Sequence, residues 1–195
     1  MSPSAHDLDE LIVTVSDLLV ASADNSDVLL DGSVEQVLRA VRHQLKLDVI
    51  FVGEFVDGRR VLRFVASGGG RAPMKVDDSE PLEVTYCKRV VDGRLPEWVA
   101  DTALLAAAAR PSAGGARVGT HLSTPVVLHD GSTYGTLCCF SATASPDTRQ
   151  QHVLVLRECA RLVARKLDLT QAPPRRQQRP DFADTEPGEL AWQLQ

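Results

Sequence analysis

The sequence contains no apolar run that approaches the roughly 20 residues of a membrane-spanning helix. Its first residues, MSPSAHDLDELIV, are acidic and contain no basic region, so they do not have the pattern of a secretory signal. The net charge of −5 provides no overall field that would attract nucleic acid or an anionic membrane. These absences predict a cytoplasmic protein that binds neither nucleic acid nor membrane.

Short chemical motifs are also missing. The four cysteines, Cys87, Cys138, Cys139 and Cys159, form no C-x-x-C pair. Since neighbouring residues of a strand point to opposite faces, the adjacent Cys138 and Cys139 are not expected to act together. The sequence therefore predicts buried free thiols, no metal site and no obvious redox motif. The glycine triplet at residues 68–70 is not followed by G-K-[ST], which disfavours a phosphate-binding loop.

The stretch that organises the chain is residues 123–141, STPVVLHDGSTYGTLCCFS. Asp130-Gly131 lies between two apolar runs, 126–128 and 134–140, and this pattern is a strong short-range signal for a β-hairpin. Both runs are mostly apolar rather than alternating, which indicates central strands covered on both faces.

Hydrophobic periodicity and turn residues place the other elements. Ser33-x-x-Gln36 is a capping box, Asp57-Gly58 is a second hairpin turn, and Pro146 is suited to the first turn of a helix. The expected helices cover residues 7–22, 33–45, 81–91, 103–110 and 146–169, and the expected strands cover 48–56, 61–67, 118–128 and 134–140.

This order predicts an α+β fold, because hairpins join the strands and no βαβ rhythm is present. One domain is expected over residues 1–169, with its core at 33–169 and an additional helix at 7–22. Residues 170–195 are rich in Pro and Arg and then acidic, which favours a flexible tail.

Three strings resemble the GAF domain, a small-molecule sensor module of signalling proteins. They are DVIFVGEF at 48–55, TYCKRVVDGRLPEWVAD at 85–101, and STPVVLHDGSTYGTLCCF at 123–140 followed by a long helix. The resemblance implies a profilin- or PAS-like antiparallel sheet. It places amphipathic N- and C-terminal helices that dimerise on one face, and a ligand pocket walled by loops and a helix on the other. Known ligands of the family are diverse, so the resemblance leaves the ligand and any cofactor unidentified.

Some subfamilies are disfavoured by missing motifs. The Asn-Lys-x-x-x-Phe-Asp-Glu string of the cyclic-nucleotide binders is absent, and Cys87 is followed by Lys88 rather than by the His of a bilin attachment site. The Cys-Gly string of the lineage that reduces free methionine sulfoxide is also absent.

Several residues fall where the resemblance places the pocket. Cys87 is either a thiol activated by its basic neighbours or a packing residue. Trp98 and Asp101 either form a wall of the pocket or serve as a core residue and a helix cap, respectively. His121 and Ser123 are two positions apart on a strand and so share one of its faces. The candidate ligand-binding residues are Cys87, Trp98, Asp101, His121, Ser123, Tyr134 and Phe64, with no catalytic or metal-binding residues.

The function expected from these features is that of a non-enzymatic bacterial regulatory domain. It would bind a small molecule and signal as a homodimer, through its N- and C-terminal helices, or through a partner protein. Two alternatives stay open: an interaction and dimerisation scaffold with a vestigial pocket, and a thiol-based reductase of free methionine sulfoxide.

Overall fold

The structure is a computed structural model, and it describes residues 13, 27–68, 74–110, 117–146 and 148–171. The helix expected at 7–22, apart from Val13, and the tail beyond residue 171 lie outside the described residues. The described elements are α2 (Asp27–Leu45), β1 (Val49–Val56), β2 (Arg59–Ser67), β3 (Ser79–Pro81), η1 (Leu82–Val84), α3 (Tyr86–Val91), β4 (Trp98–Val99), η2 (Thr102–Leu104), η3 (Ala107–Ala109), β5 (Thr120–Val127), β6 (Thr133–Ser141) and α4 (His152–Gln171).

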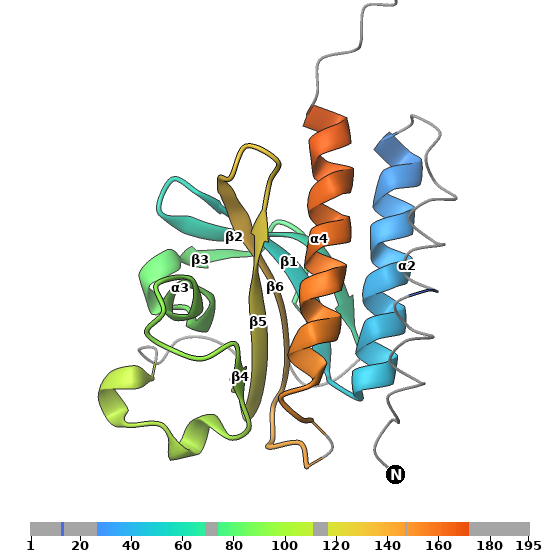
Figure 1. Cartoon of the computed structure of the whole chain (residues 1–195). Helices are drawn as coiled ribbons and strands as arrows, with labels where there is room; N and C mark the ends of the chain where they lie inside the picture. Colours follow the sequence, from blue (N-terminus) through green and yellow to red (C-terminus); the bar gives the residue numbers. More distant parts are fainter. Residues whose placement is uncertain (1–12, 14–26, 69–73, 111–116, 147, 172–195) are drawn as a thin grey trace, which may run out of the picture.

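The strands form one antiparallel sheet in the order β3-β2-β1-β6-β5-β4. Helices α2 and α4 lie side by side against one face of this sheet, and α3 lies on the other side (Figure 1). The α+β class and the sheet with its flanking helices are therefore confirmed. No helix among the described residues is long and apolar enough to cross a membrane.

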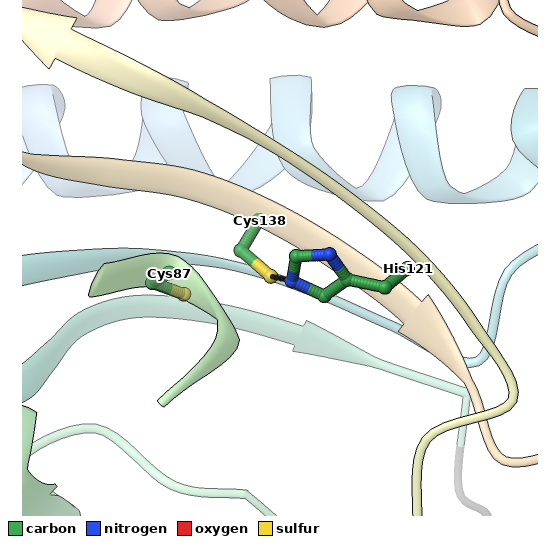
Figure 2. A group of neighbouring side chains, drawn as sticks. All are labelled: Cys87, His121 and Cys138. Atoms are coloured by element: carbon green, nitrogen blue, oxygen red, sulfur yellow. Dashed lines mark hydrogen bonds between the residues drawn. The ribbon is translucent and has the colours of Figure 1, made fainter. Parts of the chain in front are cut away.

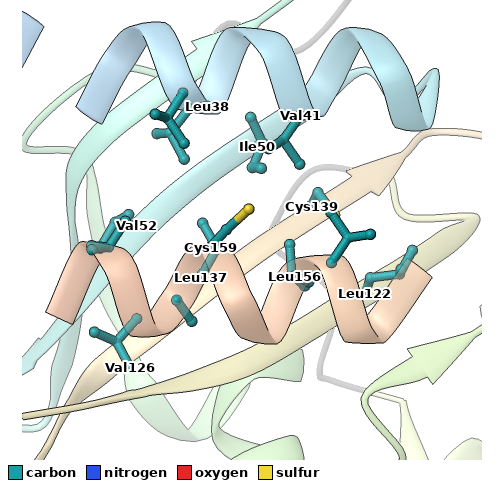
Figure 3. Packing of buried hydrophobic residues seen from close by; sticks show 14 of the residues in the cluster. Leu38, Val41, Ile50, Val52, Leu122, Val126, Leu137, Cys139, Leu156 and Cys159 are labelled. Carbon is teal, nitrogen blue, oxygen red and sulfur yellow. The ribbon is translucent and has the colours of Figure 1, made fainter. Parts of the chain in front are cut away.

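The main hydrophobic core lies between the sheet and the helix pair α2 and α4 (Figure 3). We call it the helix-side cluster. Helices α2 and α4 contribute apolar residues at helical spacing, and strands β1, β2, β5 and β6 contribute residues from one face of the sheet. Its buried strand members are Ile50, Val52, Ala66, Leu122, Val126, Leu137 and Cys139.

Both predicted hairpins are present. Asp57 and Gly58 have positive φ angles of 49° and 70°, and Gly131 has a φ of 83° in the β5–β6 turn. The register between β5 and β6 shifts between Val126 and Val127, one residue after Pro125.

Helix boundaries differ from the sequence expectations. Helix α2 begins at Asp27, so Ser33 lies inside the helix and the capping box does not mark its start. Helix α4 begins at His152 rather than at Pro146. Residues 150–151 form a turn before it, and the Arg149 N–H donates to His152 Nδ1 at 3.1 Å. Local signals are weak compared with the packing that decides where a helix ends.

The segment between β2 and β5 is less regular than expected. The helix predicted at 81–91 is the short turn η1 followed by α3, and the helix predicted at 103–110 is two separate 3₁₀ turns, η2 and η3. Five alanines raise local helix propensity there, but a run this short does not repay the cost of helix nucleation without a buried face. The edge strand β3 lies where the sequence predicted no strand.

Candidate functional site

The face of the sheet opposite α2 and α4 carries the candidate site, and we call it the α3-side face. Alternation along β6 separates the two adjacent cysteines: Cys139 joins the helix-side cluster, and Cys138 joins a second cluster beneath α3. The buried members of this second cluster, the α3-side cluster, are Val49, Phe51, Leu62, Cys87, Cys138 and Phe140.

Helix α3 brings Cys87 down onto this face. Thr85 caps the helix, because its side-chain oxygen accepts a hydrogen bond from the Lys88 N–H at 3.1 Å. Cys87 then lies in the first turn, fully buried. Arg89, on the same helix, donates to the carbonyl oxygens of Ala108 and Arg110 at 3.1 and 3.3 Å and so ties α3 to the η3 segment.

Three side chains from distant parts of the chain meet under α3 (Figure 2). The sulfur atoms of Cys87 and Cys138 and a ring nitrogen of His121 all lie within 4.8 Å of one another, and all three residues are buried. His121 Nε2 is 3.3 Å from Cys138 Sγ. The Tyr86 ring centroid lies 5.1 Å from that of His121 and covers the imidazole. The result is a compact set of soft ligand atoms shielded from solvent.

A buried arginine adjoins this set. Arg60 of β2 is only 8% exposed, and its Nη1 donates to Cys87 Sγ at 3.2 Å. Its Nη2 forms an ion pair with Glu80, and its guanidinium carbon lies 4.7 Å from the centroid of the Phe51 ring. The side chain crosses the sheet over Gly53, where a Cβ atom would lie 2.9 Å from Arg60 Cγ. The absence of a side chain at Gly53 therefore gives Arg60 its path to Cys87.

The two sulfur atoms have different electrostatic environments. The pKa of Cys87 is lowered well below its usual range by a hydrogen bond from Cys138, by the charge of Arg60 and by His121, against the opposing effect of burial. Burial, followed by the hydrogen bond and charge of Cys87, raises the pKa of Cys138. Cys87 is therefore the more readily ionised thiol of the pair. On the other face, burial raises the pKa of Cys159 to about 12.

Several buried polar atoms on the α3-side face lack partners. His121 Nδ1, Ser123 Oγ, Thr136 Oγ1 and Arg60 Nε are inaccessible to solvent and have no hydrogen-bond partner among the described residues. Strand register places Ser123 opposite Cys138 and Thr136 beside Gly53, so these atoms share the face that carries Cys87. Buried polar atoms of folded proteins are nearly always hydrogen-bonded, and exceptions need a physical cause.

The structure brings three of the seven candidate residues to this face, namely Cys87, His121 and Ser123. Trp98, Phe64 and Tyr134 instead pack against the helix-side cluster, so they do not line a common site with Cys87. Burial raises the pKa of Tyr134 to about 12.

Asp101 takes the role of a helix cap, which was the alternative interpretation of this residue. Its carboxylate accepts a hydrogen bond from the Ala103 N–H at 2.9 Å at the start of η2. The carboxylate therefore belongs to the local turn at the start of η2.

Arg60 and Cys138 are central to the cluster but were not among the sequence candidates. Cys138 could have been found by register, since an antiparallel hairpin turning at Asp130-Gly131 brings it opposite Ser123. Nothing in the sequence indicated that Arg60 is buried, because an arginine beside a hairpin turn is ordinarily exposed.

The described residues also form a surface groove of about 440 Å³ between α2 and β2. It is lined by Glu35, Arg39, Arg42, His43, Val65, Ala66 and Ser67. None of the seven candidate residues lines it, so it is a separate feature from the cysteine cluster.

The sheet order, the helix pair and the position of α3 define a known class of domain. The chain belongs to the GAF domain family, whose sequence profile matches residues 29–168. No relative was found among curated proteins.

Solved structures share the fold at low sequence identity. The GAF domain of a phosphoenolpyruvate-protein phosphotransferase from Coxiella burnetii is 15% identical, with a TM-score of 0.66 over 86% of this chain and 96% of that one. Free methionine-R-sulfoxide reductase from Neisseria meningitidis, in complex with its substrate, is 11% identical, with a TM-score of 0.65 over 88% and 98%. The phycocyanobilin-bound GAF domain of a cyanobacterial phytochrome is 11% identical, with a TM-score of 0.65 over 87% and 97%.

These neighbours include both ligand-binding domains and an enzyme. The GAF fold supports a sensory, regulatory or ligand-binding module, and at these identities the likeness establishes the fold alone.

Proposed function

We propose that this protein is a non-enzymatic sensory or regulatory GAF domain that binds a small polar molecule on its α3-side face. The signal leaves through a homodimer formed by the terminal helices or through a partner protein. The observation that carries the proposal is the set of unpartnered polar atoms on that face, from His121, Ser123 and Thr136.

A bound molecule would supply what these atoms lack. Each buried polar atom without a partner costs about 1–3 kcal/mol, so a ligand that hydrogen-bonds to several of them recovers free energy that the folded domain has lost. Arg60 and His121 favour a ligand with acceptor groups beside the hydroxyls of Ser123 and Thr136. The site is closed over by α3, so entry requires α3 to move. The contacts of Arg89 to the η3 segment are the hydrogen bonds that such a movement would break.

The proposal is tested by native mass spectrometry of the full chain purified from its own host. The wild type is expected to carry a bound small molecule. A double variant, Ser123→Ala with Thr136→Val, is expected to lose it, because the substitutions remove two hydroxyls while nearly preserving the packing volume.

Thr120→Val is the matched control. The Thr120 hydroxyl is already satisfied, since it donates to the Ala100 carbonyl oxygen at 2.7 Å and accepts from the Ser145 N–H at 2.6 Å. This variant should retain the bound mass. A wild-type protein that carries no small molecule, although it is folded, would support the alternative of an interaction scaffold with a vestigial pocket.

A thiol-based reductase is a second candidate, and the proximity of Cys87 to Cys138 favours it. The sequence contained no adjacent resolving cysteine, but the fold brings Cys138 close to Cys87, where it could take that role. In such a reaction the Cys87 thiolate attacks the sulfoxide sulfur and Cys138 then displaces the product. Two thiols and one sulfoxide thereby give a disulfide, a thioether and water, and an external thiol reduces the disulfide. Turnover of free methionine sulfoxide with dithiothreitol, abolished in Cys87→Ser and kept in Cys159→Ser, would favour this candidate over a sensor.

A further inference from the structure

The three ligand atoms under α3 have the identities and spacing of a transition-metal site. We propose that Cys87, Cys138 and His121 bind one Zn²⁺ ion and leave its fourth coordination position open. This inference deepens the proposed function and rests on it for the identity of the fourth ligand, which would be the sensed molecule. Binding of the metal itself is measured separately.

The spacing needs little adjustment. With Zn–S bonds of about 2.3 Å and Zn–N bonds of about 2.0–2.1 Å, a tetrahedral ion separates two sulfur ligands by about 3.8 Å and a sulfur from a nitrogen by about 3.5 Å. In the structure Cys138 Sγ and His121 Nε2 are 3.3 Å apart, and all three ligand atoms lie within 4.8 Å of one another. Small side-chain rotations therefore suffice to enclose the ion.

The charges balance when the ion is present. Zn²⁺ with two thiolates and a neutral imidazole is electrically neutral, and the adjoining Arg60 is paired with Glu80. The Arg60 N–H that donates to Cys87 Sγ at 3.2 Å can keep this hydrogen bond when the sulfur binds a metal, as donors around a metal site commonly do. Arg60 is thus compatible with a bound cation, because its charge is paired with Glu80 and its hydrogen bond is to the Cys87 sulfur.

Three protein ligands with an open fourth position are the pattern of zinc sites that interact with small molecules, whereas purely structural sites usually have four. The unpartnered hydroxyls of Ser123 and Thr136 lie on the same face and would contact a molecule held at that position. The two proposals therefore describe one site, in which the ion anchors a ligand and the hydroxyls orient it.

The test uses the full chain, reduced and treated with a chelator. Zn²⁺ is titrated against a chromophoric competitor, and Co²⁺ is added separately as a spectroscopic probe. One equivalent of Zn²⁺ should bind, and Co²⁺ should give thiolate-to-metal charge-transfer bands with the intense visible absorption of a tetrahedral site. Cys87→Ala, Cys138→Ala and His121→Ala should each weaken Zn²⁺ binding by more than about 100-fold, and Arg60→Met by about 10–100-fold.

Cys139→Ala and Cys159→Ala are the matched controls, since both residues are buried free cysteines of the helix-side cluster. They should bind Zn²⁺ as the wild type does. Because a ligand variant can fail to fold, the wild type provides an independent measurement. Bound Zn²⁺ should protect Cys87 and Cys138 of the folded chain from alkylation, and Zn²⁺ should not protect the cysteines of a denatured chain.

The inference is overturned if the folded wild type binds less than one equivalent, if its Co²⁺ spectrum is octahedral, or if the Cys139 control loses binding equally. A chain that instead forms a Cys87–Cys138 disulfide with hydrogen peroxide and binds no metal when reduced would be a redox pair. If Zn²⁺ binds but no small molecule is found by native mass spectrometry, the metal site stands and the sensor proposal fails.

Discussion

The two faces of the sheet are built by the same strands and differ in what they bury. The helix-side face is mainly apolar, with residues such as Ile50, Leu122 and Leu137 packed against α2 and α4. The α3-side face buries a guanidinium, an imidazole, two hydroxyls and two neighbouring thiols. Apolar burial stabilises a fold and buried polar groups without partners oppose it, so we assign stability to the first face and propose the second face for binding. Each of the four predictions below tests this division.

The largest effect is expected in the helix-side cluster. Leu156 of α4 is fully buried, so Leu156→Ala should lower the free energy of unfolding by about 2–5 kcal/mol in urea denaturation. Leu154, two residues earlier, is 60% exposed, and Leu154→Ala should change stability little. Similar costs for the two variants would contradict the assignment of stability to this face.

On the α3-side face, Gly53→Ala should disturb Arg60. The new Cβ would lie 2.9 Å from Arg60 Cγ and 3.0 Å from Cδ, so the guanidinium must shift away from Cys87 at a cost of about 1–3 kcal/mol. Urea denaturation of the two single variants and of the double variant Gly53→Ala with Arg60→Met tests this explanation. If both act through the arginine, the double variant should be less destabilised than the sum of the two single variants. Additive costs would mean that Gly53 acts elsewhere.

Two buried threonines allow a direct comparison of satisfied and unsatisfied hydroxyls. Thr136→Val should leave the free energy of unfolding unchanged or raise it by about 1 kcal/mol, because Thr136 Oγ1 has no partner among the described residues. Thr120→Val should lower it by about 1 kcal/mol, since two hydrogen bonds are lost. Thermal and chemical denaturation measure the stability of both variants. Equal losses of stability would show that the Thr136 hydroxyl has a hydrogen-bond partner in solution.

The smallest effect concerns an exposed ion pair at the tip of the β5–β6 hairpin. His129 Nδ1 lies 2.9 Å from Asp168 Oδ1 of α4, and this hydrogen bond and the carboxylate charge raise the pKa of His129 above its ordinary value of 6.5. A raised pKa in the folded state means that the stabilisation is complete below pH 6.5 and is lost as the pH rises through the folded-state value. The difference in unfolding free energy between wild type and His129→Asn should therefore shrink from acidic to alkaline pH. A difference that grows with pH would contradict this pairing.

Much of the fold was accessible from local patterns. Asp57-Gly58 and Asp130-Gly131 correctly marked the two hairpins. Short hairpin turns need residues that adopt positive φ angles, and Asp-Gly pairs do so readily. The helix predicted for the alanine-rich segment at 103–110 was wrong. Without a buried face, the helix propensity of this segment yields only 3₁₀ turns. Alternation along β6 correctly separated Cys138 from Cys139.

The candidate site was predictable only in part. His121 and Ser123 share a face because strand geometry has a period of two, and this follows from the sequence. Trp98 could not be assigned, since its two-residue strand β4 carries too little pattern to show which face it covers. Arg60 was missed because its burial depends on Glu80, Phe51 and the space above Gly53.

The sequence by itself determined the antiparallel sheet, its central hairpin and the pair of amphipathic helices, because these depend on periodicity and turn geometry within short stretches. Only the tertiary structure decided the chemistry of the α3-side face. Cys87 and Cys138 are 51 positions apart in the chain and have no sequence relation that marks them as a pair. The register of β5 on β6 and the docking of α3 place them together, and the hydrogen bond from Cys138 and the charge of Arg60 then lower the pKa of Cys87 against the effect of burial.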